Sequence, residues 1–248
     1  MKKTVYKIGS LLLFGILGIK SLAVPLLPMK FDKRIDGNGS YQEYQVDNPT
    51  NETLRYKIYK KPEPKDLTDK GIIGSMDKWI EFYPKILTIP PKSKGIVKVA
   101  IKAPKNVKQG EYAARVGTTP VAIPKVGENG ETINAQISLP VGTEIQIFGY
   151  VGDIAPKIEG ELKEKKTENG SFVTGNIKNT GSAGVGILAS YRYKDTTGTH
   201  TKILSLGRIM PGQEIKVDTS TVKNSKEHKV LALSIKEDGG TTSFLTYK

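Results

Sequence analysis

Short runs in which apolar and polar residues alternate fill most of this chain, and this period of two limits its fold more than any other feature. The stretch from Lys94 to Lys102 reads Lys-Gly-Ile-Val-Lys-Val-Ala-Ile-Lys, and similar runs are bounded by Gly, Pro, Asn and Asp. Alternation of this kind is typical of strands with one buried and one wet face, and no window keeps a helical period for three turns. The sequence therefore predicts an all-β protein.

The spacing of these runs divides the chain into two similar halves around a short segment, 152–156. The strands expected before it span 27–35, 41–47, 54–60, 85–89, 95–102, 111–117 and 132–151, and those after it span 157–165, 172–177, 186–193, 202–206, 214–217, 229–235 and 242–247. Seven short strands per half suit two immunoglobulin-like β-sandwiches, and the short linker predicts a restricted angle with an inter-domain cleft. We expect one domain over 24–153 and the other over 154–248.

An internal echo supports the same strand order in both halves. The run Val-Asp-Asn-Pro-Thr around Asn48 is matched by Ile-Lys-Asn-Thr-Gly around Asn179, where an expected strand ends in an Asn able to cap its own turn. Further along, Ile-Pro-Pro at 89–91 is matched by Ile-Met-Pro-Gly at 209–212, each followed by another expected strand. The identity between these segments is too thin to indicate duplication.

The first 23 residues have the pattern of a secretory signal peptide. Lys2, Lys3 and Lys7 make a positive start, the apolar stretch 8–19 follows, and Ser-Leu-Ala at 21–23 offers small residues for cleavage. The apolar stretch is shorter than the roughly 20 residues needed to cross a bilayer, and no second apolar run follows it. We expect an exported mature chain that begins at Val24 and has no integral membrane span.

The residue inventory disfavours most enzyme and cofactor chemistry. The chain has no Cys and two His, which removes thiolate sites and leaves little for a histidine-based zinc site or a Ser-His-Asp relay. The formal net charge of +13 is diffuse, because lysines are interleaved with acids and apolar residues rather than gathered in one basic stripe. We therefore expect no catalytic activity, no metal or cofactor, and no nucleic-acid partner.

The long run 132–151 is the most informative part of the sequence. Its apolar positions alternate with polar ones and begin with Ile133, Ala135, Ile137 and Leu139. Pro140 cannot donate to a ladder, which favours a sheet edge or a bulge. Two interpretations are open: an ordinary strand whose apolar face is core, or an edge strand that pairs with a partner and inserts alternate side chains into the partner's groove. Periodicity alone favours the first.

The first half resembles the periplasmic chaperones of pilus and fimbria assembly. The resemblance rests on the run from Tyr83 to Lys94, Tyr-Pro-Lys-Ile-Leu-Thr-Ile-Pro-Pro-Lys-Ser-Lys, which leads into an alternating strand, and on Gly-Glu-Tyr-Ala-Ala-Arg-Val at 110–116. In that family a proline-rich turn precedes the fifth strand, a Gly-Glu-Tyr type start opens the sixth, and a long seventh strand follows. The resemblance covers about 27–153, and the second half agrees only in length and strand order.

The resemblance implies donor-strand complementation, in which the seventh strand lends alternating apolar residues to an incomplete pilin sandwich. On this chain, the residues that would fill the pilin groove are Ile133, Ala135, Ile137 and Leu139. The family anchors the pilin carboxylate with two bases in the inter-domain cleft; Lys33 or Arg34 matches the first, but the stretch expected to carry the second holds Glu144 instead. This departure suggests a divergent chaperone or a different client.

The resemblance further implies pilin or fimbrial subunits as partners, a periplasmic location, and no cofactor or catalysis. It leaves open which subunit is bound and whether an outer-membrane usher takes part. The alternative is a structural or adhesive surface protein built from two immunoglobulin-like modules.

Overall fold

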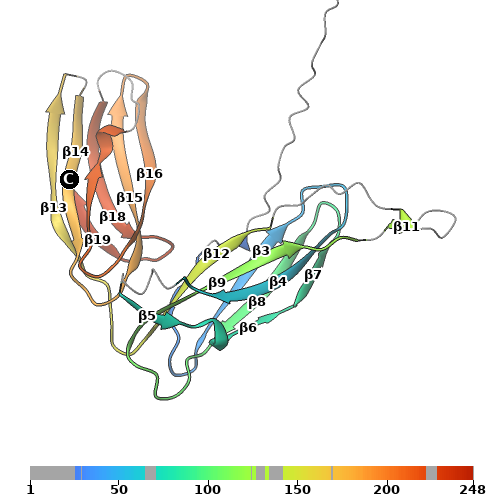
Figure 1. The fold of residues 1–248 in the computed structure, drawn as a ribbon. Helices are drawn as coiled ribbons and strands as arrows, with labels where there is room; N and C mark the ends of the chain where they lie inside the picture. Colours follow the sequence, from blue (N-terminus) through green and yellow to red (C-terminus); the bar gives the residue numbers. More distant parts are fainter. Residues whose placement is uncertain are drawn as a thin grey trace, which may run out of the picture.

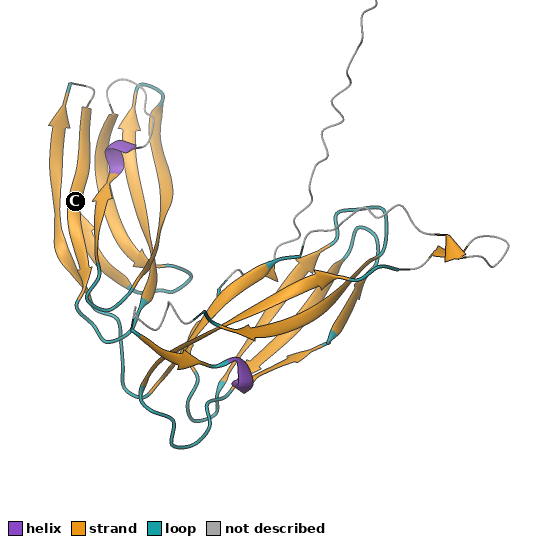
Figure 2. Ribbon diagram, viewed as in Figure 1, coloured by secondary structure: helices purple, strands orange, loops and turns teal. Residues whose placement is uncertain are grey.

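The chain folds into two β-sandwiches that are built almost entirely of strands and turns (Figure 2). This computed structural model describes residues 26–28, 30–64, 71–123, 125–126, 132–133, 142–168, 170–221 and 228–247. The expected signal peptide lies outside these residues. No helix in the described part of the chain is long and apolar enough to cross a membrane.

The first sandwich packs two sheets face to face (Figure 1). One sheet has the order β1-β3-β8-β6, formed by Leu26–Leu27, Ser40–Asp47, Lys94–Ile101 and Ile80–Tyr83. The other has the order β2-β12-β9-β4-β7, formed by Asp32–Arg34, Glu144–Val151, Gly110–Pro120, Leu54–Pro62 and Ile86–Ile89. Three further pieces are β5 (Ile72–Ser75), which pairs with β9, the 3-10 turn η2 (Asp77–Trp79), and the small hairpin of β10 (Lys125–Val126) and β11 (Thr132–Ile133).

Alternation along the strands builds the core of this sandwich. In β8, Val97, Val99 and Ile101 are buried while Lys94 and Lys98 are exposed, as the period of two predicts. Other large buried side chains of the same core include Tyr44, Tyr56, Phe31 and Ile147. The core is therefore a continuous apolar layer that fixes which face of every strand looks outward.

The second sandwich has seven strands, all of which the sequence predicts. They are β13 (Ile158–Thr167), β14 (Gly170–Asn179), β15 (Val185–Asp195), β16 (Gly198–Ile209), β17 (Glu214–Asp218), β18 (His228–Glu237) and β19 (Ser243–Tyr247), with the 3-10 turn η3 at Thr219–Thr221. One layer is β13-β14-β17 and the other is β19-β18-β15-β16; β14 and β18 join them at Gly170 and Ser171. Ile177, Ile187 and Leu233 lie in the core between the layers. The prediction of an all-β fold with two sandwiches is confirmed.

Some predicted strands of the first half are wrong. The expected strand at 27–35 is broken into β1 and β2, which belong to different sheets. Strands β5 (Ile-Ile-Gly-Ser) and β6 (Ile-Glu-Phe-Tyr) were not predicted, because neither short run shows a sustained alternation of apolar and polar residues. The expected single strand at 132–151 is not continuous: β11 ends at Ile133, and β12 begins only at Glu144, after the non-strand residues Gly142 and Thr143.

A buried asparagine ties the end of β3 to the end of β7. Asn48 is almost fully buried, and its Nδ2 group donates to the carbonyl oxygen of Ile89 at 3.0 Å. Its Oδ1 atom accepts a hydrogen bond from the Thr50 N–H at 3.0 Å. The side chain thus caps its own turn and also holds the turn that leads into β8.

Asn179 makes the equivalent hydrogen bonds in the second sandwich. Its buried Nδ2 group donates to the carbonyl oxygen of Ile209 at 3.0 Å, and its Oδ1 atom accepts from the Gly181 N–H at 2.9 Å. The two asparagines therefore make equivalent bonds at equivalent strand ends, which gives the echo between the halves a physical cause.

Replacement of Asn179 by Ala should destabilise the protein by about 2–3 kcal/mol, because buried carbonyl groups lose their donor and stay out of water. Asn176→Ala is the matched control, since Asn176 is exposed on the same strand and should change the free energy of unfolding by less than about 0.5 kcal/mol. Urea unfolding measures both. Equal unfolding midpoints for the two variants would contradict this role of Asn179.

Candidate functional site

Strand β12 has a neighbour along its whole length on one side and along only part of its length on the other. It pairs antiparallel with β9 from Glu144 to Val151, whereas β2 runs parallel to it only over Phe148 to Tyr150. Among the described residues, no strand pairs with the other side of β12 from Glu144 to Ile147. The first half of β12 is therefore an open sheet edge.

The hydrogen-bond pattern shows which backbone groups face this edge. The Thr118 N–H donates to the Thr143 carbonyl at 2.8 Å, so the backbone N–H and C=O groups of the odd-numbered residues in this region point to β9. The Phe148 N–H donates to the Phe31 carbonyl at 2.8 Å, so the backbone groups of the even-numbered residues point to the side of β2. Because the direction alternates along a strand, the N–H and C=O groups of Glu144 and Gln146 face the open edge.

The side chains of the open edge are divided between the two faces of the sheet. Ile145 and Ile147 are buried in the protein's own core, and Glu144 and Gln146 lie on the opposite face. Any strand that pairs here would therefore contact β12 mainly through backbone groups. The apolar side chains of the open edge, Ile145 and Ile147, are not available to a partner.

The structure describes little of the segment expected to serve as the donor strand. Ile133 lies in β11, where its backbone is opposite Lys125 of β10. Ala135, Ile137 and Leu139 lie outside the described residues. Eleven sequence positions separate Ile133 from the first residue of β12, and the donor role of these four residues stays a prediction.

Lys33 is already engaged within the first sandwich. It lies on the same face of β2 as the buried Phe31 and Ile35, and its Nζ donates to the Tyr41 carbonyl at 2.9 Å and to Gln42 Oε1 at 2.8 Å. Burial lowers the pKa of Lys33 below its ordinary value. An incoming carboxylate would have to replace these contacts.

Arg34 is more accessible than Lys33. It is opposite Tyr150 in the parallel pair of β2 and β12, and its side chain is 49% exposed. It forms two long ion pairs, with Asp36 at 3.8 Å and Asp153 at 3.7 Å. Because exposed ion pairs of this length are weak, Arg34 can exchange these partners for another carboxylate at little cost in free energy.

Glu144 lies far from the linker that joins the two domains. It begins β12 and Val151 ends it, which places the two residues about 23 Å apart at the usual rise of a strand. Its carboxylate accepts hydrogen bonds from Tyr59 at 2.9 Å and Arg115 at 3.0 Å and pairs with Lys61 at 2.6 Å. Burial acts to raise the pKa of Glu144, but these partners outweigh it and hold the pKa below its ordinary value.

The sequence analysis matched Glu144 to the second base of the inter-domain cleft, and this match is wrong. The linker end of β12 is occupied by Tyr150 and Val151 instead. Glu144 belongs to a charged cluster beside the open edge.

The cleft between the domains holds an ion cluster that the sequence did not reveal. Arg208 of β16 reaches from the second sandwich to the carboxylates of Asp32 and Glu111 in the first. Its guanidinium lies 3.8 Å from the centre of the Phe148 ring, and the Gly184 N–H donates to Glu111 Oε2 at 2.8 Å. These contacts hold the two sandwiches together at this point.

Burial is deep in this cluster. The side chains of Arg208, Asp32 and Glu111 are 15%, 8% and 1% exposed. Desolvation raises the pKa of Asp32, although the charge of Arg208 and its hydrogen bond act in the opposite direction. Beside the cluster is a hollow of about 320 Å³, lined by Asp32, Tyr150, Pro156 and Glu237 among others, which is the cleft that the short linker predicts.

Replacement of Arg208 by Met should destabilise the protein by about 3 kcal/mol, because two buried carboxylates lose their counter-charge. The matched control is Arg192→Met on β15, where the arginine is exposed. Adding Asp32→Asn and Glu111→Gln to Arg208→Met should restore part of the loss. Urea unfolding and the solution radius of gyration measure the effect; an unfolding midpoint for Arg208→Met equal to that of Arg192→Met would contradict it.

No family model matches the chain, and no curated protein matches it. Among solved structures the chain is similar to the E. coli chaperone DraB, with 10% identity, 91% of this chain and 96% of that chain covered, and a TM-score of 0.45. A chain of the Salmonella enterica SafA pilin complex with the SafB chaperone gives 14% identity, 91% and 95% coverage, and a TM-score of 0.45. The class 5 fimbriae chaperone CfaA gives 14% identity, 90% and 97% coverage, and a TM-score of 0.43.

Proposed function

We propose that this chain is an exported chaperone that holds a pilin-like or fimbrial subunit through the last strand of its first domain. The observation that carries the proposal is the open edge of β12 from Glu144 to Ile147, which has no partner strand among the described residues. An edge of this kind accepts an extended segment of another protein by β-augmentation.

The open edge supplies backbone recognition. A client strand can pair with the N–H and C=O groups of Glu144 and Gln146, each bond contributing about 1 kcal/mol net. This part of the interaction makes few demands on the client's side chains, which suits a chaperone that receives several related subunits.

The segment before β12 would supply the apolar contribution. In this proposal Ile133, Ala135, Ile137 and Leu139 occupy the groove that an incomplete client sandwich leaves open. Burying each of the larger side chains would contribute about 1.5–3 kcal/mol, without nucleotide hydrolysis or a metal. The complex would last until the next subunit supplies its own strand.

Arg34 is the candidate anchor for the client's terminal carboxylate. It lies beside the linker end of β12, it is half exposed, and its present ion pairs with Asp36 and Asp153 are long. A guanidinium binds a carboxylate through two parallel hydrogen bonds, which would fix the register of the client along β12. Lys33 could contribute only by leaving Tyr41 and Gln42.

The proposed location is the periplasm, reached through the signal peptide at 1–23. The domains proposed are 24–153 and 154–248; the first core ends at Val151 and the second begins at Ile158. An outer-membrane usher is a further partner in this proposal.

Gln146→Pro tests the open edge directly. Its N–H faces away from β9, so the substitution removes a donor to the client and leaves the internal ladder intact. We expect the amount of client subunit that co-purifies with the exported protein to fall by about tenfold, and the urea midpoint to stay near that of the wild type.

The matched control is Ile86→Pro on β7, which is another edge strand. The Ile58 N–H donates to the Lys85 carbonyl, so the backbone groups of Ile86 face away from β4. Ile86→Pro should retain the client. If wild type purifies from its native host without any β-rich partner, or if Gln146→Pro retains its client fully, the chaperone proposal fails and the adhesive or structural alternative gains support.

A further inference from the structure

Strand β6 is an edge strand on the opposite margin of the first sandwich from β12 (Figure 1). It pairs with β8 on one side only, and the described residues place no strand on its other side. Two hollows flank it, of about 620 Å³ and 710 Å³. We call β6 together with these two hollows the β6 margin.

The β6 margin carries a concentrated positive charge. Six lysines line the two hollows, and Glu81 is the only acid among the lining residues. The six are Lys57, Lys60, Lys78, Lys85, Lys102 and Lys105. Within the described part of the chain, none of them forms an ion pair, whereas Lys61 and Arg115 near β12 are paired with Glu144.

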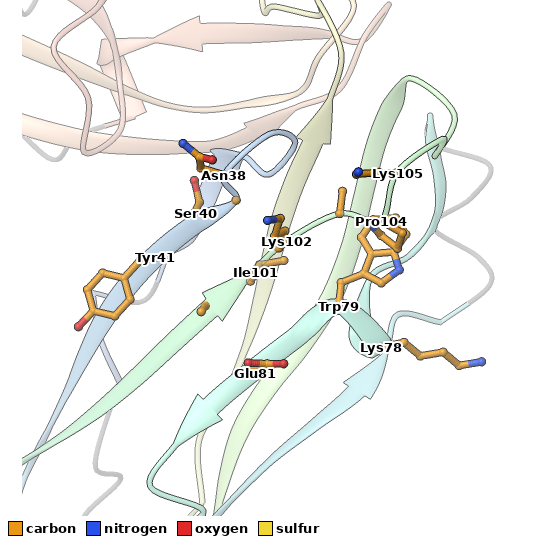
Figure 3. Close-up of a pocket in the computed structure, with 13 residues that line it drawn as sticks. Asn38, Ser40, Tyr41, Lys78, Trp79, Glu81, Ile101, Lys102, Pro104 and Lys105 are labelled. Atoms are coloured by element: carbon orange, nitrogen blue, oxygen red, sulfur yellow. The ribbon is translucent and has the colours of Figure 1, made fainter.

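An aromatic side chain, Trp79, lies among the lysines of the first hollow (Figure 3). Trp79 packs partly buried against the first core, with its ring centre 4.6 Å from that of Tyr112. The close-up shows its ring beside Pro104, with Lys102 and Lys105 nearby. In the second hollow, Phe82 and the 56% exposed Ile86 provide further apolar surface.

The backbone of β6 offers a short open edge between the two hollows. The Lys102 N–H donates to the Trp79 carbonyl, so the groups that face β8 are those of Trp79, Glu81 and Tyr83. The N–H and C=O groups of Ile80 and Phe82 therefore point away from the sheet. Lys60 Nζ donates to the Ile80 carbonyl at 2.5 Å, which leaves the Phe82 groups for a partner.

We propose that the β6 margin binds an extended, acidic segment of a partner protein, in which acidic residues alternate with apolar ones. Because successive side chains of a strand point to opposite faces, the apolar ones would enter one hollow and the acidic ones would meet the lysines of the other, while the backbone would pair with Phe82. Two concave hollows separated by a strand edge fit a chain better than they fit the flat surface of a membrane. Because the β6 margin and the β12 edge are on opposite sides of the sandwich, both can be occupied at once.

Binding of a fluorescein-labelled peptide of alternating Glu and Val, measured by fluorescence anisotropy, tests this proposal. The wild type should bind it, and higher salt should weaken the binding because exposed charges are screened. The combined variant Lys57→Glu, Lys85→Glu, Lys102→Glu and Lys105→Glu should bind at least about tenfold more weakly. A peptide of alternating Lys and Val should not bind.

The control variant has the same change in net charge at exposed lysines of the second sandwich: Lys165→Glu, Lys166→Glu, Lys178→Glu and Lys202→Glu. It should bind the acidic peptide within about twofold of the wild type, since these charges are remote from the β6 margin. Gln146→Pro should also bind it normally, which separates this surface from the proposed chaperone edge.

Three results would overturn the proposal: no binding of the acidic peptide to wild type, equal weakening in the two charge-reversal variants, or unchanged binding in the β6 variant. A fourth is capture of the wild type, but not the β6 variant, by phosphatidylglycerol vesicles without peptide binding, which would assign the lysines to an anionic lipid surface instead.

Discussion

The buried contact of Arg208 with Asp32 and Glu111 is the interaction on which the arrangement of the two sandwiches depends. An isolated charge in such a position is strongly unfavourable, so each partner needs the others in place. Asp32 is in β2 and the ring under the guanidinium, Phe148, is in β12. The contact between domains thus also fixes the two strands that meet at the linker end of the first sandwich.

The open edge follows from the shortness of β2. Because β2 runs parallel to β12 and begins only at Asp32, opposite Phe148, it covers only the second half of β12. The backbone groups of Glu144 and Gln146 therefore have no neighbour among the described residues. Exposed edges favour unwanted pairing between proteins, and charged residues close to an edge reduce that risk. The cluster of Glu144, Lys61 and Arg115 is placed where it can do so. An edge that is open but flanked by charge can select a partner rather than aggregate.

Much of the fold could be predicted from the sequence because its signals are local. The seven strands of the second sandwich alternate over enough residues to show their period, and Asn48 and Asn179 mark equivalent strand ends within a few residues of their turns. Two features gave no such signal: the run Ile-Glu-Phe-Tyr of β6 has no sustained alternation, and the gap between β1 and β2 was hidden in an apolar run.

The site depends on contacts between residues distant in sequence, and these could not be predicted. Nothing near Arg208 in the sequence indicates that it lies against Asp32, 176 positions away. Lys33 and Arg34 are adjacent, but successive side chains of a strand point to opposite faces. The Lys33 side chain therefore contacts the first sandwich, whereas that of Arg34 is exposed. The family resemblance also matched Glu144 to a base in the cleft, because the sequence alone does not show where β12 begins.

Amide hydrogen exchange at Gln146, followed by NMR in the free protein and in its complex with the client subunit, tests the central claim most directly. The account predicts rapid exchange at Gln146 in the free protein, because its N–H has no acceptor among the described residues, and exchange at least about tenfold slower in the complex. The Ile147 amide, which points to β9, should be protected in both states, and the Thr88 amide on the β7 edge should not respond to the client. A Gln146 amide as well protected as that of Ile147 before any client is added, or one that the client leaves unchanged, would contradict the account.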